Sequence, residues 1–206
     1  MSTRTDEELE EIVERLLRSV GLWGVHWLDM MTLITALKRE KSEFRNYERV
    51  SDELMPDAEA QWDATKGVLR MRESVFRAMQ NNSGRARNTI AEEIGHFALG
   101  HVGILNRSIQ KSAIEKSVPR IMREEAEAKR FAPRLLAPAK LIPAEASPDD
   151  LVRLFGISRQ SALIRREELD RMRRRAEGKG RELPSFVVDF LKEARRRGAK
   201  IRTDLD

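Results

Sequence analysis

Apolar residues recur at helical spacing in the first part of the chain. Between Asp6 and Val20 the positions that carry them are three or four residues apart: Leu9, Ile12, Val13, Leu16 and Leu17. Such positions share one face of a helix, so this segment is predicted to be an amphipathic helix that Thr5 or Asp6 caps. A second helix is predicted from Trp27 to Leu37, and the more polar segment from Lys38 to Pro56 is predicted to be a loop.

The hydrophobic period changes after Ala60. In the segment 68–72, Leu69 and Met71 alternate with arginines, which is typical of a strand with one buried face. A hairpin around Gly67 is therefore predicted, with Leu69 and Met71 facing inward. Two or three short strands among many helices predict a mostly helical α+β fold.

Helical patterns also dominate the rest of the chain. They are predicted over residues 75–80, 86–101, 118–136, 151–155, 158–177 and 185–197. Ser147 followed by Pro148 is a strong helix start, and Gly156 predicts a turn between two helices. We divide the chain into a first domain, residues 1–145, and a helical C-terminal segment, residues 146–206.

Composition narrows the possible functions. The 206 residues include 39 Lys and Arg against 34 Asp and Glu, a net charge of +5 that permits an acidic partner without requiring one. The absence of cysteine excludes disulfides, thiolate metal sites and cysteine nucleophiles. No apolar run has the length of a membrane span, and the first residues do not resemble a signal peptide. We therefore expect a soluble cytoplasmic protein with no membrane association.

The segment 88–101 is one residue short of a zinc-peptidase helix. Such a helix places two histidines four residues apart, where both reach one Zn²⁺, and a glutamate beside the first acts as general base. Glu93 and His96 occupy the positions of the base and the second ligand, whereas Glu92 occupies that of the first histidine. Positions four apart share a helical face, so Glu92 and His96 can point at one ion.

A third ligand has to come from elsewhere, and the later helix offers Glu124, Glu125 and Glu127. Glu127 has the best context, because it precedes an apolar stripe that would hold this helix against the motif helix: Ala128, Phe131, Ala132 and Leu135. His101 follows His96 by five residues, about 140° around a helix, so it is expected to end the helix or pack locally rather than join the ligands. His26 is expected to be structural.

These motifs resemble the ImmA/IrrE family of zinc metallopeptidases. The segment 84–87 is similar to the Gly-Arg-x-Arg that leads into the family's motif helix, and the segment 127–138 follows its Glu-Ala-x-x-Phe-Ala-x-x-Leu-Leu-x-Pro pattern. The resemblance covers roughly residues 62–169. It implies a zincin-like peptidase domain in residues 1–145, and an endopeptidase that acts on a helix-turn-helix transcriptional repressor.

The resemblance also assigns roles to four residues. It implies a zinc ion held by Glu92, His96 and Glu127, with Glu93 as the general base. Two carboxylates and one imidazole cancel the charge of Zn²⁺, whereas two imidazoles and one carboxylate leave +1, so this set would polarise water and a scissile carbonyl less well. The alternative is a non-catalytic pseudopeptidase.

A basic helix suggests a further alternative. The segment 151–169 reads as helix, turn and helix and resembles a helix-turn-helix, and arginines at positions 171 and 173–175 follow it. Their charges could neutralise phosphates, although Glu167, Glu168 and Asp170 interrupt the basic face. A DNA-binding regulator is thus the second alternative, with nucleic acid a less favoured partner than protein.

Overall fold

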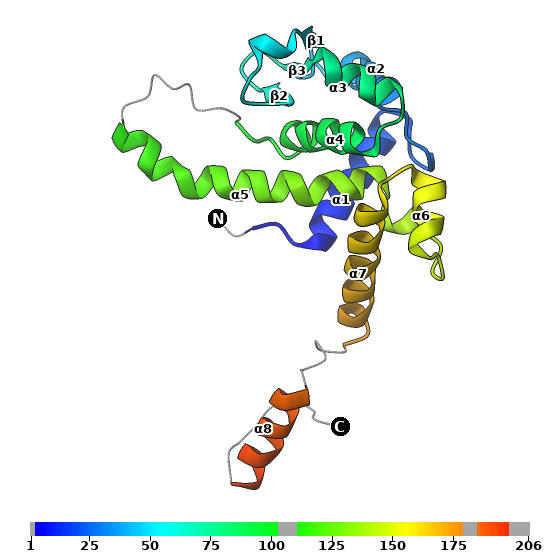
Figure 1. Ribbon diagram of the computed structural model, residues 1–206, viewed down its shortest axis with the longest axis vertical. Helices are drawn as coiled ribbons and strands as arrows, with labels where there is room; N and C mark the ends of the chain where they lie inside the picture. The colour runs from blue at the N-terminus through cyan, green and yellow to red at the C-terminus, as the bar shows by residue number, and fades with distance from the viewer. Residues whose placement is uncertain (1–2, 103–110, 179–184, 198–206) are drawn as a thin grey trace. The chain divides into compact units, whose positions relative to one another are not determined.

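The computed structural model describes residues 3–102, 111–178 and 185–197 (Figure 1). The chain divides into two compact units, residues 1–169 and 170–206. This boundary lies beyond the one that we placed after residue 145, because Leu151, Phe155 and Ala162 belong to the hydrophobic core of the larger unit. The smaller unit carries the end of one helix and α8 (Ser185–Arg196).

Two helices open the larger unit. Helix α1 (Asp6–Ser19) begins in a capping box formed by Thr5 and Glu8, and it buries the predicted apolar face. Helix α2 (Met30–Glu40) begins three residues later than predicted. The reason is Asp29, whose carboxylate accepts a hydrogen bond from the Thr32 N–H at 2.6 Å and caps the helix there.

A three-stranded sheet follows, in the order β1-β3-β2. Strands β2 (Ala60–Asp63) and β3 (Val68–Arg72) form the predicted antiparallel hairpin, and Leu69 and Met71 are fully buried. Gly67 in their turn has φ +67°, and a side chain there would overlap the Glu43 carbonyl oxygen. The hairpin prediction is therefore confirmed.

Strand β1 (Asn46–Val50) corrects the loop predicted for Lys38 to Pro56. It pairs in parallel with β3, from Asn46 opposite Val68 to Val50 opposite Arg72. All five of its side chains are exposed or half-buried, so no alternation of apolar and polar residues marks it. Backbone pairing at a sheet edge, rather than burial, creates this strand.

The next three helices supply the core beneath the sheet. Helix α3 (Glu73–Gln80) follows β3, α4 (Gly84–Ala98) carries the motif, and α5 (Lys111–Leu136) runs alongside α4 (Figure 1). Gly95 allows α4 and α5 to approach closely, because a Cβ atom there would lie 3.0 Å from the Phe131 ring.

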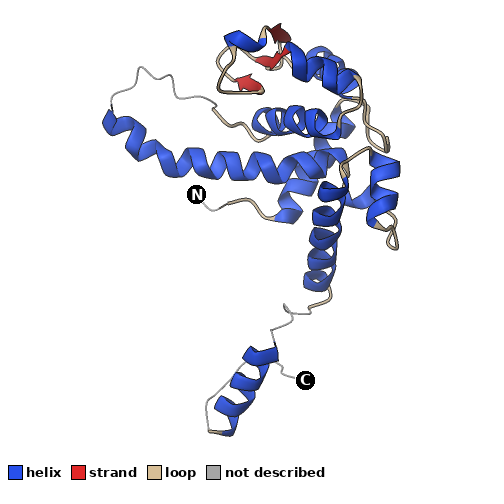
Figure 2. Cartoon of the chain, in the orientation of Figure 1, coloured by secondary structure: helices blue, strands red, loops and turns tan. Residues whose placement is uncertain are grey.

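The remaining helices complete the larger unit. Helix α6 (Pro148–Phe155) begins at the predicted Ser147 cap and ends at Gly156, and α7 (Arg159–Ala176) follows. Helices dominate and the sheet is small, which confirms the mostly helical α+β class (Figure 2). Within the described ranges, no helix is both long and apolar enough to cross a membrane.

Candidate functional site between α4 and α5

The predicted site residues lie where α4 faces α5 and the edge strand β2. Helix α4 supplies Glu92, Glu93 and His96, while α5 supplies the candidate third ligands. The four predicted site residues have different contact partners, so their side chains do not form one cluster.

Glu93 is turned toward the sheet. Its Oε2 accepts a hydrogen bond from the Trp62 N–H of β2 at 2.7 Å. Burial raises the pKa of Glu93 to about 8, against the lowering effect of that hydrogen bond, and the charges of Glu92 and Glu125 raise it further. Without a bound cation, Glu93 is therefore mostly protonated at neutral pH.

Glu92 is turned toward α5 and is half-buried. Burial raises its pKa above the ordinary value, the positive charge of Lys129 opposes that effect, and the negative charge of Glu125 adds to it. The residue at the first-ligand position is thus a carboxyl group whose charge is disfavoured by its surroundings.

His96 is buried between two polar neighbours. Its Nδ1 lies 3.1 Å from His101 Nδ1, and its Nε2 lies 3.6 Å from Glu125 Oε1. Burial lowers the pKa of His96, although the charges of Glu125 and Glu124 oppose this. The ring is accordingly neutral near pH 7.

His101 packs against His96, as the expectation of local packing has it, but the path of the chain differs from the one assumed. The expectation assumed a helix that continues to residue 101, but α4 ends at Ala98. Gly100 has φ +68°, the Gly100 N–H donates to the Phe97 carbonyl, and the His101 N–H donates to the His96 carbonyl. This is a Schellman motif, which reverses the chain and returns the His101 ring to His96.

The contacts between the two rings and Glu127 favour one arrangement of the ring protons. His101 Nε2 lies 3.4 Å from Glu127 Oε2, and burial lowers the pKa of His101 to about 4, so its ring is neutral. A carboxylate accepts, so His101 Nε2 carries the proton and its Nδ1 accepts from His96 Nδ1–H. In this arrangement His96 Nε2 carries a lone pair and lies 3.6 Å from Glu125 Oε1.

Glu127 is held by Arg4 from the segment before α1. The Arg4 N–H donates to Oε1 at 3.0 Å, and the Arg4 guanidinium forms an ion pair with Oε2. Burial alone would raise the pKa of Glu127, but the hydrogen bonds from Arg4 and His101 and the charge of Arg4 lower it. This carboxylate is ionised and paired, with only 3 % of its surface exposed.

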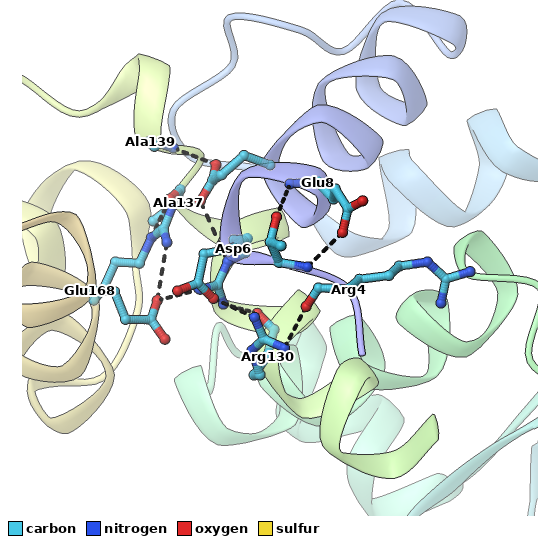
Figure 3. A network of polar contacts seen from close by, with 11 residues as sticks. Arg4, Asp6, Glu8, Arg130, Ala137, Ala139 and Glu168 are labelled. Atoms are coloured by element: carbon cyan, nitrogen blue, oxygen red, sulfur yellow. Dashed lines mark hydrogen bonds and ion pairs between the residues drawn. The ribbon is translucent and has the colours of Figure 1, made fainter. Parts of the chain in front are cut away.

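Two further contacts hold Arg4 in place. Its Nη2 donates to the Leu99 carbonyl at 3.1 Å, and its own carbonyl accepts from Arg130 Nη1 at 2.9 Å. Figure 3 shows Arg130 lying between Arg4 and Asp6, to which it is also bonded. The segment before α1 is thus bound to the ends of both site helices.

The arrangement can be tested against a zinc ion. In the described part of the chain, no three His, Asp or Glu side chains are grouped as metal ligands. His96 offers a suitable lone pair, but both oxygens of Glu127 are occupied by Arg4, and the charged neighbour of His96 on α5 is Glu125. The residues do not fit the ion as placed, and the ligand set Glu92, His96 and Glu127 stays a prediction.

Sequence reasoning gave no site role to His101, Glu125 or Arg4. For His101 a signal was present, because the glycine before it predicts a chain reversal after the helix. Glu125 was considered but given less weight than Glu127. No local pattern marked Arg4, whose contact with Glu127 spans 123 positions of the chain.

Comparisons with known proteins found a similar structure but no similar sequence. No family model matches the chain, and no curated protein matches it in sequence. The solved structure of a Mycobacterium tuberculosis transcriptional regulator is similar, with a TM-score of 0.50 and 18 % identity. The match covers 76 % of this chain and 45 % of the regulator, so the chain spans less than half of that protein. At this identity the likeness concerns the fold alone.

Proposed function

We propose that this chain is a regulatory protein with an ImmA/IrrE-type fold that binds a protein partner without hydrolysing it. The partner class that the resemblance implies is a helix-turn-helix transcriptional repressor. The observation that carries the proposal is the ion pair between Arg4 and Glu127.

That ion pair supplies the positive charge that a metal ion would bring to Glu127. A buried carboxylate needs a cation or several hydrogen-bond donors, and Arg4 provides both. Binding zinc through Glu127 would require Arg4 to leave, and its guanidinium would lose a charged partner. The Arg4 guanidinium therefore competes with a metal ion for Glu127.

Glu92 supports the same reading. A carboxylate in place of the first imidazole leaves a bound zinc ion with less net charge, and so with less power to acidify water. The surroundings of Glu92 also disfavour its ionised form. Two independent residues, one on α4 and one before α1, thus depart from what hydrolysis needs.

The competing proposal is a zinc endopeptidase. In that case Glu92, His96 and Glu127 would hold a zinc ion, which would supply an acidified water, and Glu93 would accept a proton and pass it to the leaving amine. The Nε2 lone pair of His96 favours this alternative. It requires that Arg4 release Glu127 and that Glu93 be ionised.

Cleavage and binding measured together separate the two proposals. The chain, purified without chelator and supplied with zinc, is mixed with helix-turn-helix repressors from its own genome, with Glu93→Gln as the matched variant. We expect saturable binding by both proteins and no cleavage by either, read by calorimetry and mass spectrometry. Cleavage by the unmodified chain that Glu93→Gln abolishes would establish the peptidase, and absence of binding to any repressor would reject the proposed partner.

DNA binding is a second candidate, favoured by exposed arginines near the end of α7. Arg173, Arg174 and Arg175 are exposed. By contrast, Arg165 is buried against Glu10 and Glu168, so the first part of α7 faces the protein core. Salt-dependent DNA binding that is lost on changing the three exposed arginines to glutamine would support this function. DNA binding that does not weaken as the salt concentration rises, or no DNA binding, would reject it.

A further inference from the structure

Two adjoining cavities lie beside the candidate site. The basic cavity, about 570 Å³, is lined by Arg4, Arg15, Lys41 and Ser19 together with apolar side chains. The apolar cavity, about 490 Å³, is lined mainly by apolar residues, among them Trp62, Phe97 and Val102. Leu16, Lys41 and Ala98 line both cavities. Each volume lies in the range of small-molecule sites.

The basic cavity carries cations without matching acids. No acidic side chain is among the described residues that line it. Arg4 is already bound to Glu127, but Arg15 and Lys41 form no ion pair with any described residue. Arg15 comes from α1 and Lys41 follows α2, so two elements bring unpaired positive charge to one cavity. Such convergence favours an anionic group.

The apolar cavity has an aromatic wall. Trp62 of β2 and Phe97 of α4 pack edge to face with their ring centroids 5.1 Å apart. Val102 lies at the rim and is 64 % exposed, which leaves an apolar side chain facing water. Glu43 also lines this cavity, beside Lys41, so a ligand anion would be disfavoured at that point. The anionic group of a ligand is therefore directed to the basic cavity.

We propose that the two cavities form one binding site for a small amphipathic anion, a carboxylate or phosphate joined to an apolar chain. The anionic group lies between Arg15 and Lys41, and the apolar chain passes Leu16 and Ala98 to reach Phe97 and Trp62. Charge-assisted hydrogen bonds hold the first part, and burial of apolar surface holds the second. This site does not depend on the proposed function, because neither a metal nor a protein partner is needed.

Four probes test the chemistry of the ligand. Decanoate and decyl phosphate, below their micellar concentrations, carry both parts, decanol lacks the charge, and acetate lacks the chain. Calorimetry should show saturable 1:1 binding of decanoate or decyl phosphate, at least about tenfold tighter than either control. The tighter of the two identifies carboxylate or phosphate as the preferred group. Equal binding of decanol, or no saturable binding of either anion, would overturn the proposal.

Variants test the location. Arg15→Gln/Lys41→Gln should weaken decanoate binding about tenfold or more, whereas the matched pair Arg39→Gln/Lys66→Gln, which removes two exposed cations outside both cavities, should leave it unchanged. Val102→Asp should also weaken binding, with Leu54→Asp as its exposed control. Because all of these positions are exposed or half-buried, the variants should fold. Unchanged binding in both Arg15→Gln/Lys41→Gln and Val102→Asp would contradict the site.

Discussion

Two clusters of charged side chains pack against α5, and they differ in balance. Near its end, three arginines meet three carboxylates in one buried network: Arg130, Arg134, Arg165, Asp6, Glu10 and Glu168. At the candidate site, five carboxylates of α4 and α5 outnumber the cations beside them, Arg4, Arg120 and Lys129: Glu92, Glu93, Glu124, Glu125 and Glu127.

The difference separates a structural cluster from a candidate functional one. In the network, Arg134 lies 2.7 Å from Asp6 and 3.3 Å from Glu168, and it joins α1, α5 and α7. Figure 3 shows Asp6 within this network. At the site, burial raises the pKa of Glu92 and Glu93, and the charges of neighbouring carboxylates add to that effect. Unbalanced buried charge of this kind is a property of sites that bind or react.

The largest expected effect comes from breaking the balanced network. Arg134→Met leaves Asp6 and Glu168 without one of their buried partners, and Arg134 itself has 0 % exposure. Removing one member of a buried ion pair costs about 3–5 kcal/mol, which urea denaturation would measure. Arg153→Met, which breaks an exposed ion pair with Asp150, is the control. It should unfold at nearly the same urea concentration as the unmodified protein. A small loss for Arg134→Met would contradict a stabilising network.

The next effect concerns the unbalanced site and depends on pH. The pKa of Glu93 is raised to about 8 in the folded chain, so the stability it contributes is present below its ordinary pKa near 4.5 and falls as pH rises through 8. Glu93→Gln removes this loss. The free energy of unfolding of the variant, minus that of the unmodified chain, should therefore be roughly 2–5 kcal/mol larger at pH 9 than at pH 5. The exposed Glu53→Gln is the control. An equal change at both pH values would show that Glu93 is ionised at neutral pH.

A smaller effect is expected from the one strong ion pair of the site. Arg4→Met should cost about 1–2 kcal/mol, because Glu127 loses its partner while part of Arg4 was already in water. Glu127→Gln in addition should restore part of that loss, since a neutral side chain tolerates burial better. Thermal unfolding of Arg4→Met, Glu127→Gln and the double variant gives the coupling free energy between the two residues. Additive losses would mean that Arg4 and Glu127 do not interact.

The smallest effect tests the chain reversal that brings His101 to the site. Gly100→Ala should cost about 1 kcal/mol, because φ +68° disfavours a side chain while the surrounding space is open. Gly21→Ala, at φ +72° in equally open space, is the matched control and should cost as much. The variants should differ in the NMR signals of the His96 ring, which only Gly100→Ala should shift. Unshifted signals would contradict the link between the turn and the ring pair.

Sequence patterns predicted what depends on local spacing. The face of α1 and the hairpin at Gly67 follow from the periods of apolar residues, and Ser147 marked the start of α6. Strand β1 was missed because none of its side chains is fully buried, so no alternation of apolar and polar residues marks it. Its partner β3 is distant in sequence, and pairing of that kind leaves no local signal.

The candidate site was predictable only in part, for the same reason. The α4 positions of Glu93 and His96 follow from helical spacing, whereas the return of His101 depends on a left-handed residue after the helix. The partner of Glu127 could not be predicted, because Arg4 reaches it through tertiary folding. Ligand sets inferred from motifs do not reveal which cation the fold itself supplies.

Zinc affinity tests most directly whether Arg4 replaces a metal at Glu127. The unmodified chain and the Arg4→Gln/Glu92→His variant are titrated with zinc against a chromogenic chelator at pH 7.5. The account predicts no stoichiometric zinc binding by the unmodified chain, and tight 1:1 binding by the variant, in which Glu127 is freed and a second imidazole restored. Tight 1:1 zinc binding by the unmodified chain, lost on changing His96 to alanine, would contradict it.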